Sequence, residues 1–296
     1  MKKTFLTLIT IAILSVGLIS CSAQPAPVET SQPTPEATQT IAPTPTEEIF
    51  ALSVNGEKIS PEELDEEISR LQKAEEIAGI IRTDEERRNF ALDELIGTLL
   101  LAQDAKEHGF QFTDEDFQNK KVELEAGLGS AQALEDWIQQ NGYTQETFRA
   151  SLERSLAAAF TRDRLMAEVP KTAQQYHLQV ILLYDLPTAE FYYNQILGGA
   201  DFNTLASTID PVTRGDIGWF PIGYLPDPAI EQAVLQMKVD EVKGIVEGKV
   251  GFYILKLLEI ESNRTLSPDA LLQTQKLAIE DWLAQQKAES VIIIQE

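Results

Sequence analysis

The sequence is poor in cysteine, in histidine and in positive charge. Cys21 is the only cysteine, so one chain can form neither an internal disulfide nor a metal site built from several cysteines. His108 and His177 are the only histidines, and no HExxH zinc motif is present. Acidic residues number 47 against 24 basic ones, for a formal net charge of −23. Because a nucleic-acid-binding surface needs an excess of Lys and Arg, we expect no nucleic-acid partner, and no metal or other cofactor is indicated.

Long apolar runs are also scarce, and the one that occurs lies at the N-terminus. Lys2 and Lys3 precede an apolar stretch at residues 5–19, which is short for a transmembrane span. It ends in the sequence LISC at residues 18–21, which resembles the lipobox of bacterial lipoprotein signal peptides. The resemblance implies a signal peptide over residues 1–20 and lipidation of Cys21. We therefore expect an extracytoplasmic protein held to the bacterial cell membrane by lipid; an ordinary signal peptide with an incidental cysteine is the alternative.

Residues 21–48 have the composition of a linker. The segment holds six prolines among Thr, Gln, Ala and Glu, and almost no large apolar side chains. Such a stretch cannot bury enough apolar surface to offset the entropy lost on ordering, and proline-rich chains tend to be extended. We interpret it as a stalk between the membrane and the folded part.

The folded part is expected to begin near Ile49 with a short strand and to continue as helices. Residues 50–54 alternate like a strand, and Asn55-Gly56 favours a tight turn. Ser60-Pro61 matches a helix cap followed by a proline in the first turn. Further helices are predicted over residues 84–108, from residue 113 onward, and over residues 144–166. His108 then lies in the last turn of a helix, where a cation is favoured, so we interpret it as structural.

Beyond residue 170 the pattern changes to mixed strands and helices. Strands are predicted at residues 177–183, 214–220, 241–246 and 251–258, with helices at residues 188–197, 201–208 and 228–237. This order with short connections predicts a small antiparallel sheet. A long helix at residues 267–289 follows, and the apolar residues 291–294 predict a last strand paired with residues 50–54. The expected fold class is therefore α+β, with a helical domain at residues 49–170 plus 266–296 and an inserted domain at residues 173–262.

Three motifs of the inserted segment occur in the order found in parvulin-type (PpiC) peptidyl-prolyl isomerase domains. Residues 199–206 (GADFNTLA) resemble that family's "GADF..LA" helix entry, residues 215–220 (GDIGWF) its "GDLGWF" segment, and residues 251–256 (GFYILK) its closing "GYHIIK" strand. The helical part, with VNGE at residues 54–57, resembles the N-terminal chaperone domain of SurA- and PrsA-type foldases. Together the resemblances cover residues 49–296 and imply a folding factor for exported proteins.

The resemblance also implies which residues form the substrate pocket and the polar centre. Leu225 and Ile230 match the pocket Met and Phe of the family, and the aromatic pair Trp219-Phe220 is retained. The polar positions differ, because neither of the family's two histidines is a histidine here. The two family histidines match Val180 and Tyr253, and the family's acid matches Asp210.

His177 is the other candidate for the first histidine. It lies three positions from Val180, and an odd offset in a strand points to the opposite face. We therefore interpret His177 as a partly exposed histidine at the start of its strand.

The chemistry that such a domain serves makes and breaks no covalent bond. X–Pro amides interconvert over tens to hundreds of seconds, and a site need only hold the proline ring and stabilise the twisted amide. Tyr253 can still donate a hydrogen bond, although both imidazoles are missing. We expect weak isomerase activity, with binding of unfolded or partly folded exported proteins containing X–Pro bonds as the main function. The alternatives are a catalytic foldase, a holdase without catalysis, and an unrelated lipoprotein such as an envelope scaffold or a solute receptor.

Overall fold

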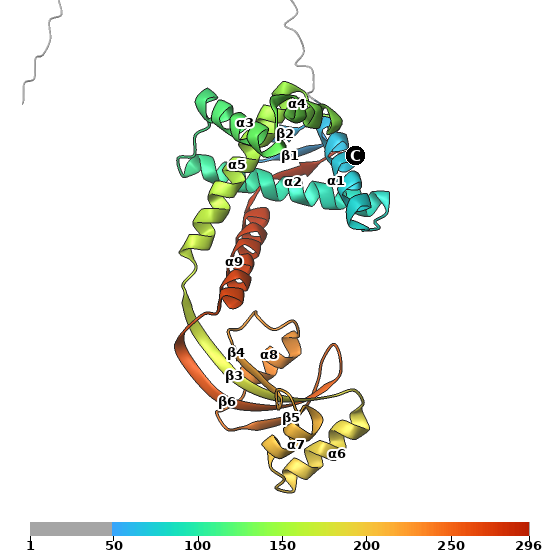
Figure 1. Ribbon diagram of the computed structural model, residues 1–296, viewed down its shortest axis with the longest axis vertical. Helices are drawn as coiled ribbons and strands as arrows, with labels where there is room; N and C mark the ends of the chain where they lie inside the picture. Colours follow the sequence, from blue (N-terminus) through green and yellow to red (C-terminus); the bar gives the residue numbers. More distant parts are fainter. Residues whose placement is uncertain (1–48, 296) are drawn as a thin grey trace, which may run out of the picture. The chain divides into compact units, whose positions relative to one another are not determined.

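The computed structural model describes residues 49–295 (Figure 1). The predicted signal peptide, the linker and Cys21 lie outside the described residues. All described elements belong to the compact unit Glu48–Glu296. In this part of the chain no helix is both long enough and apolar enough to cross a membrane.

The first part of the described chain is helical and ends at the start of a long strand. Its elements are β1 (Leu52–Val54), β2 (Glu57–Ile59), α1 (Pro61–Ala78), α2 (Asp84–Glu107), α3 (Asp114–Leu128), α4 (Ala131–Gln140) and α5 (Gln145–Glu168). The C-terminal elements α9 (Pro268–Glu289) and β7 (Ile292–Ile294) join this part. Helix α9 packs against α2 and α5. Its Trp282 and Leu283 side chains pack against two groups of buried apolar residues, one that includes Leu99 of α2 and one that includes Leu165 of α5.

The prediction that the two ends of the folded part pair is confirmed. The strands β1 and β7 are antiparallel, with Leu52 opposite Ile294, and the sheet order is β2-β1-β7. Asn55 and Gly56 both have positive φ, at 51° and 88°, as a tight hairpin turn between β1 and β2 requires. The Asn55 side chain also accepts a hydrogen bond from the backbone N–H of Val291 at 2.9 Å. The turn therefore helps to hold the C-terminal strand in place.

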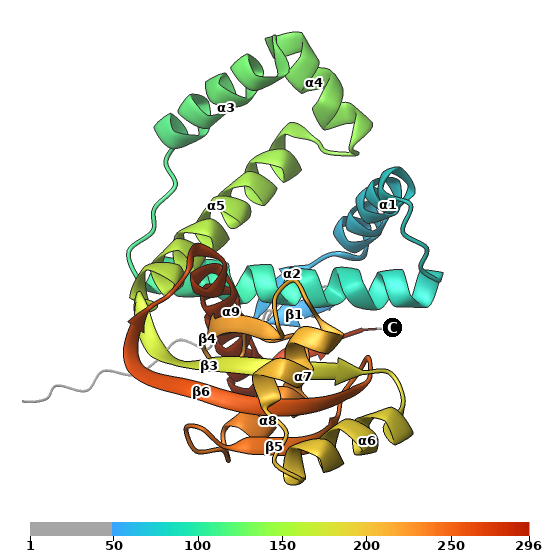
Figure 2. The ribbon, with the colours of Figure 1, turned by 60° about the horizontal axis from the view of Figure 1, so that its bottom comes forward.

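One helix of this part was not predicted. Helix α4 begins after Ser130, whose side chain accepts from the backbone N–H of Ala133. It buries Leu134 and Ile138, which are four residues apart and face one side of the helix. Figure 2 shows α4 between α3 and α5 in the chain, as a helix separate from the one expected from residue 113 onward. A ten-residue helix with two buried positions gives too short a pattern to stand out in the sequence.

Side-chain caps fix the starts of α2 and α3. The Thr83 and Thr113 hydroxyls accept from Glu86 N and Asp116 N, and the two acidic side chains accept in return from the cap residues. Hydrogen bonds from the backbone and side chain of Thr83 lower the pKa of Glu86 below its ordinary value of 4.5. The side chain and backbone of Thr113 do the same to the pKa of Asp116. Both caps therefore stabilise the fold more strongly while their carboxyls are ionised.

Acidification is expected to weaken these caps. A carboxyl whose pKa is lowered by folding contributes stability above its unfolded pKa, and the contribution is lost as the pH falls through the folded pKa. We expect the thermal midpoint to fall below pH 4.5 less steeply in the Thr83→Ala/Thr113→Ala variant than in the parent chain. Melts at fixed ionic strength across an acidic pH series measure this. Relief of self-repulsion acts on both chains alike, so parallel curves would contradict the prediction.

The second part of the chain is built on a four-stranded antiparallel sheet of order β4-β3-β6-β5. Its elements are β3 (Thr172–Leu183), α6 (Leu186–Leu197), α7 (Phe202–Ile209), β4 (Asp216–Phe220), α8 (Pro228–Val234), β5 (Val242–Glu247) and β6 (Phe252–Thr265). The antiparallel strand directions agree with the predicted sheet. Strands β3 and β6 are longer than predicted, because their pairing continues from Leu183↔Phe252 to Thr172↔Thr265.

Helices cover both faces of this sheet (Figures 1 and 2). Helices α6 and α7 pack on the face that carries Ile181, Leu183 and Ile254. Helix α8 packs on the other face, against the cluster that contains Leu178, Phe220 and Tyr253. Because both faces bury apolar side chains, β3 and β6 read as almost continuous apolar runs near their paired ends. The face covered by α8 carries most of the predicted site residues.

Candidate functional site

Val180 and Tyr253 lie on the same face of the sheet. Leu182 is directly opposite Tyr253, and Val180 is directly opposite Leu255. Residues two apart in a strand share a face, and directly opposed residues do too. Both side chains therefore belong to the cluster on the α8 face, Tyr253 as a buried member and Val180 as a partly buried one.

The two predicted pocket residues join the same cluster. Ile230, on α8, is 6% exposed, and Leu225, in the loop before α8, is partly buried against the cluster. Phe220, at the end of β4, is 1% exposed and packs against Tyr176 with ring centroids 6.2 Å apart. The structure thus brings Leu225, Ile230 and Phe220 together with the positions that match the family's histidines.

Trp219 is separated from this group. It alternates with Phe220 along β4 and so lies on the opposite face of the sheet. Its ring stacks on His177 at a centroid distance of 5.1 Å, and the Arg264 guanidinium lies 4.2 Å from the ring centroid. Of the pair Trp219-Phe220, only Phe220 therefore lies with the other predicted pocket residues.

His177 lies with Trp219, away from Val180. Its ring nitrogens face two carboxylates, Asp216 at 3.0 Å and Glu259 at 3.5 Å. The expectation of an opposite-face histidine agrees with this arrangement. Its placement at the start of the strand was wrong, because β3 already begins at Thr172.

Asp210 lies beside Val180 but is occupied by its own loop. Both residues line a cavity of about 340 Å³, together with Tyr184 and Ile217. The Asp210 carboxylate accepts hydrogen bonds from the Thr213 hydroxyl and from the backbone N–H groups of Val212 and Thr213. These bonds, the Thr213 side chain first, lower the pKa of Asp210. An ionised carboxylate that is hydrogen-bonded within its own loop is expected to stabilise that loop. Asp210 stays a predicted site residue only because it lies beside Val180.

Tyr253 has a buried acidic neighbour that the sequence did not single out. Asp227 is 6% exposed and caps α8, accepting from Ala229 N at 3.1 Å and from Lys249 N at 2.6 Å. Burial raises the pKa of Tyr253, and the negative charge of Asp227 raises it further. The phenol is therefore neutral at physiological pH and can donate a hydrogen bond. The pair Asp227-Pro228, an acidic cap followed by proline, is the sequence signal that could have identified Asp227.

A second buried carboxylate fixes the loop that carries Leu225. Glu231, on α8, is 7% exposed, and its two oxygens accept from Gly223 N at 2.9 Å and Leu225 N at 2.7 Å. These bonds satisfy two backbone N–H groups of a partly buried loop. Glu231 therefore positions Leu225 over the apolar cluster, and no local sequence signal distinguishes it from any other helical glutamate.

The arrangement combines an apolar surface with one neutral donor. Leu225 and Val180 are among its partly buried apolar members, and the Tyr253 hydroxyl can donate a hydrogen bond. Within residues 49–295 no group of three or more His, Cys, Asp or Glu side chains is placed to hold a metal ion.

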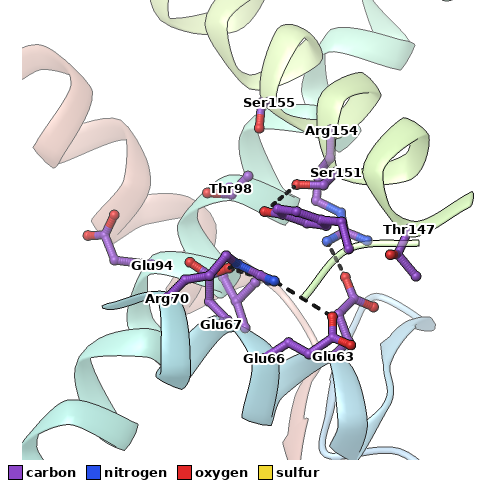
Figure 3. A pocket seen from close by; sticks show the side chains of 12 residues that line it. Glu63, Glu66, Glu67, Arg70, Glu94, Thr98, Thr147, Ser151, Arg154 and Ser155 are labelled. Atoms are coloured by element: carbon purple, nitrogen blue, oxygen red, sulfur yellow. Dashed lines mark hydrogen bonds and ion pairs between the residues drawn. The ribbon is translucent and has the colours of Figure 1, made fainter. Parts of the chain in front are cut away.

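A further concave site lies in the helical part, between α1, α2 and α5 (Figure 3). Its volume is about 210 Å³, and glutamates and arginines make up half of the residues that line it. Arg154 pairs with Glu63 at 2.7 Å, and Arg70 pairs with Glu67 at 2.8 Å. The Arg154–Glu63 pair bridges α5 to α1, whereas the Arg70–Glu67 pair lies within α1.

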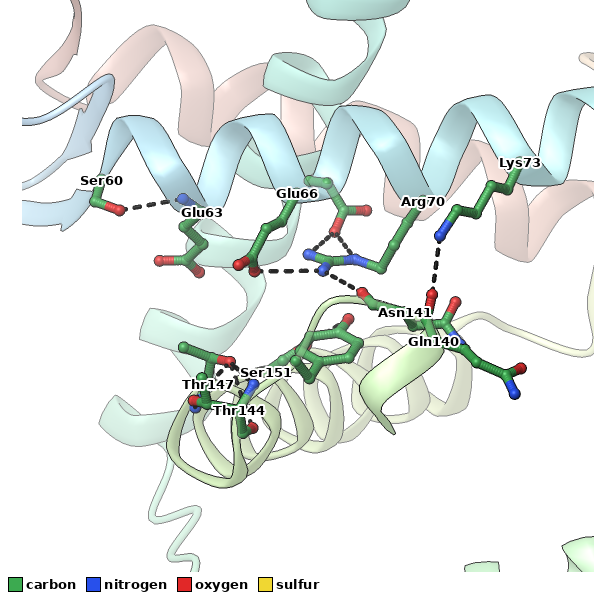
Figure 4. Close-up of polar contacts among 12 residues, drawn as sticks. Ser60, Glu63, Glu66, Arg70, Lys73, Gln140, Asn141, Thr144, Thr147 and Ser151 are labelled. Atoms are coloured by element: carbon green, nitrogen blue, oxygen red, sulfur yellow. Dashed lines mark hydrogen bonds and ion pairs between the residues drawn. The ribbon is translucent and has the colours of Figure 1, made fainter. Parts of the chain in front are cut away.

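Helix α1 is also tied to the turn between α4 and α5 (Figure 4). Arg70 donates to the backbone carbonyl of Asn141 at 3.2 Å, and Lys73 donates to that of Gln140 at 2.9 Å. The Arg70 guanidinium lies 4.1 Å from the ring centroid of Tyr143. The wall that contains Tyr143 is therefore held in a fixed position relative to α1.

Comparisons with known proteins agree with this two-part organisation. Residues 2–161, more than half of the chain, match the family described as the SurA-like N-terminal domain. Residues 187–259 match the PPIC-type PPIASE domain.

Similar proteins include members from several bacteria. The chain is 25% identical over 313 residues to the foldase protein PrsA of Caldanaerobacter subterraneus subsp. tengcongensis, covering 99% of this chain and 92% of the relative. It is 27% identical over 223 residues to the chaperone SurA of Ralstonia nicotianae, covering 62% of this chain and 45% of that protein. The crystal structure of PrsA from Bacillus cereus is similar at 20% identity and a TM-score of 0.43, over 77% of this chain and 81% of that one.

Proposed function

This chain belongs to the PrsA- and SurA-like family of foldases and chaperones with a PPIC-type domain, and we propose that it is an extracytoplasmic folding factor that binds unfolded exported proteins. Residues 1–20 and Cys21, which resemble a lipoprotein signal, support a lipid anchor in the bacterial cell membrane. The composition of residues 21–48 supports a stalk between that anchor and the folded part. The domains are then a helical chaperone domain at residues 49–170 plus 266–296 and an isomerase domain at residues 173–262.

The proposed isomerase activity is weak. The observation that carries this is the packing of Leu225 and Ile230 against the sheet face that holds Val180 and Tyr253. The apolar surface for a proline ring is retained, whereas the matched histidine positions hold an aliphatic side chain and a neutral phenol. Loss of one fixed polar group from a site that stabilises a transition state costs about 10²–10³ in rate in other enzymes, so a much reduced rate follows. Asp210 and Tyr253 are the polar groups left to assist.

Isomerase activity and client binding can be distinguished by measuring both on the same protein. We expect the soluble part, residues 49–296, to accelerate isomerisation of a short X–Pro peptide only slightly, while it suppresses aggregation of a reduced, unfolded protein. The Leu225→Asp change, at a partly buried loop position, should abolish the remaining acceleration and spare the suppression. A rate typical of an active parvulin would contradict weak activity, and failure to suppress aggregation would contradict client binding.

A holdase without any isomerase activity is the second candidate function. The observation that favours it is the internal use of Asp210, whose carboxylate is already bonded to its own loop. In that case the X–Pro peptide isomerises at its uncatalysed rate, and the Leu225→Asp variant is indistinguishable from the parent chain in both assays. An envelope scaffold would show neither activity.

A further inference from the structure

The helical part holds an apolar cavity of about 300 Å³ between α3, α4 and α5. Its walls include the side chains of Leu124, Leu128, Leu134, Trp137, Phe148 and Leu152. Leu128 and Trp137 are 45% and 42% exposed, so the cavity is open to solvent beside them. An apolar protein cavity of about 150 Å³ can hold benzene. This cavity therefore has room for a large aliphatic or aromatic side chain.

Tyr143 separates the apolar cavity from the acidic cavity of Figure 3. Tyr143, Ser151 and Ser155 line both. The Tyr143 ring stacks on Trp137 with centroids 6.1 Å apart, and its hydroxyl lies 3.4 Å from the Ser151 hydroxyl. The two cavities are thus neighbouring compartments with a shared wall, and the contacts of Arg70 and Lys73 hold that wall before any ligand binds.

The acidic compartment carries more negative than positive charge. Four glutamates and two arginines line it. Glu66 and Glu67 share Arg70, at 3.6 Å and 2.8 Å. The Glu94 side chain forms no ion pair or hydrogen bond with any other described residue. A positively charged ligand is attracted to such a site, and a negatively charged one is repelled.

We propose that the two compartments together bind a segment of an unfolded client in which a large apolar side chain stands next to Lys or Arg. The apolar side chain enters between α3, α4 and α5, and the cation lies by Glu66 and Glu94. This inference rests on the proposed client binding and adds its place in the chain and the class of segment. Charge complementarity favours a basic segment, because the excess of carboxylates in the acidic compartment would repel an acidic one.

Peptide binding to the full chain tests the class of segment. The probe is a short fluorescent Gly/Ser peptide with Lys-Phe-Lys at its centre, measured by anisotropy. Replacing Phe with Ala should weaken binding about tenfold, because most of the buried apolar area is lost. Replacing both Lys with Gln should weaken it about two- to fivefold, and added salt should close that gap.

Matched variants test the place. Leu128→Ser should weaken binding of every Phe peptide about fivefold, whereas Val122→Ser, at an exposed position of the same helix outside the cavity, should leave it unchanged. Glu66→Gln/Glu94→Gln should remove the preference for Lys over Gln. Glu62→Gln/Glu85→Gln, on the same two helices but outside the compartment, should retain it.

Each failure points to a different proposal. If the chain binds neither these peptides nor a reduced, unfolded protein, client binding itself is wrong. If it binds the unfolded protein while Leu128→Ser and Val122→Ser behave alike, only the place proposed here is wrong. If the peptide with Lys and the peptide with Gln bind equally at low salt, the charge preference is overturned.

Discussion

Replacing Gly215 with alanine is expected to lower the free energy of unfolding by about 2–5 kcal/mol, from left-handed backbone strain plus overpacking. Gly215 has a φ of 73°, and a Cβ there would overlap the carbonyl oxygen of Val180. The two backbones are already joined by a 2.8 Å hydrogen bond from Val180 N to Gly215 O. A side chain would therefore force β3 and the start of β4 apart at the residue that matches the family's first histidine.

Gly218 provides the matched control for this change. It lies three residues further along with nearly the same φ, 75°, but a Cβ there would meet no atom within 4 Å. Gly218→Ala should therefore cost only the dihedral strain, about 1–2 kcal/mol. Chemical denaturation of both variants measures the two costs. If both variants lost the same free energy of unfolding, the close approach of the Val180 and Gly215 backbones would not contribute to the cost of Gly215→Ala.

Local patterns in the sequence predict much of this fold, because caps, turns and apolar ends act over a few residues. Thr83, Thr113 and Thr144 begin helices where expected, and the apolar residues 292–294 pair with β1 as predicted. The extension of β3 and β6 beyond the predicted strands was not visible. Its residues, such as Gln174 and Glu261, are polar and exposed, so no apolar alternation marks them.

The candidate site was predictable where it depends on strand geometry and unpredictable where it depends on tertiary partners. Val180 and Tyr253 meet on one face as the matched motifs imply. The separation of Trp219 from Phe220 follows from simple alternation and could have been stated in advance. Asp227 could have been recognised as a helix cap, but its bond from Lys249 N and the two bonds of Glu231 could not, because these partners are backbone N–H groups outside its own cap, and a backbone group leaves no mark in the sequence.

Replacing Glu231 with glutamine should lower the free energy of unfolding by about 1–3 kcal/mol, the usual cost of leaving a buried polar group unpaired. The amide can accept one of the two backbone hydrogen bonds that the carboxylate accepts from Gly223 and Leu225. Its NH₂ group then faces the other backbone N–H, and two donors oppose each other in a buried place. The side chains have the same size, so the loss comes from hydrogen bonding rather than from packing.

The change should also reach the proposed proline pocket, since Glu231 holds the loop that carries Leu225. Glu241→Gln is the matched control, because Glu241 accepts one bond, from Lys238 N at 2.8 Å, in an exposed turn where water can replace it. Unfolding experiments should show a larger loss for Glu231→Gln, and X–Pro peptide binding should weaken in that variant alone. Equal losses would mean that water reaches the Gly223–Leu225 turn, and Glu231 would then be a surface carboxylate without a positioning role.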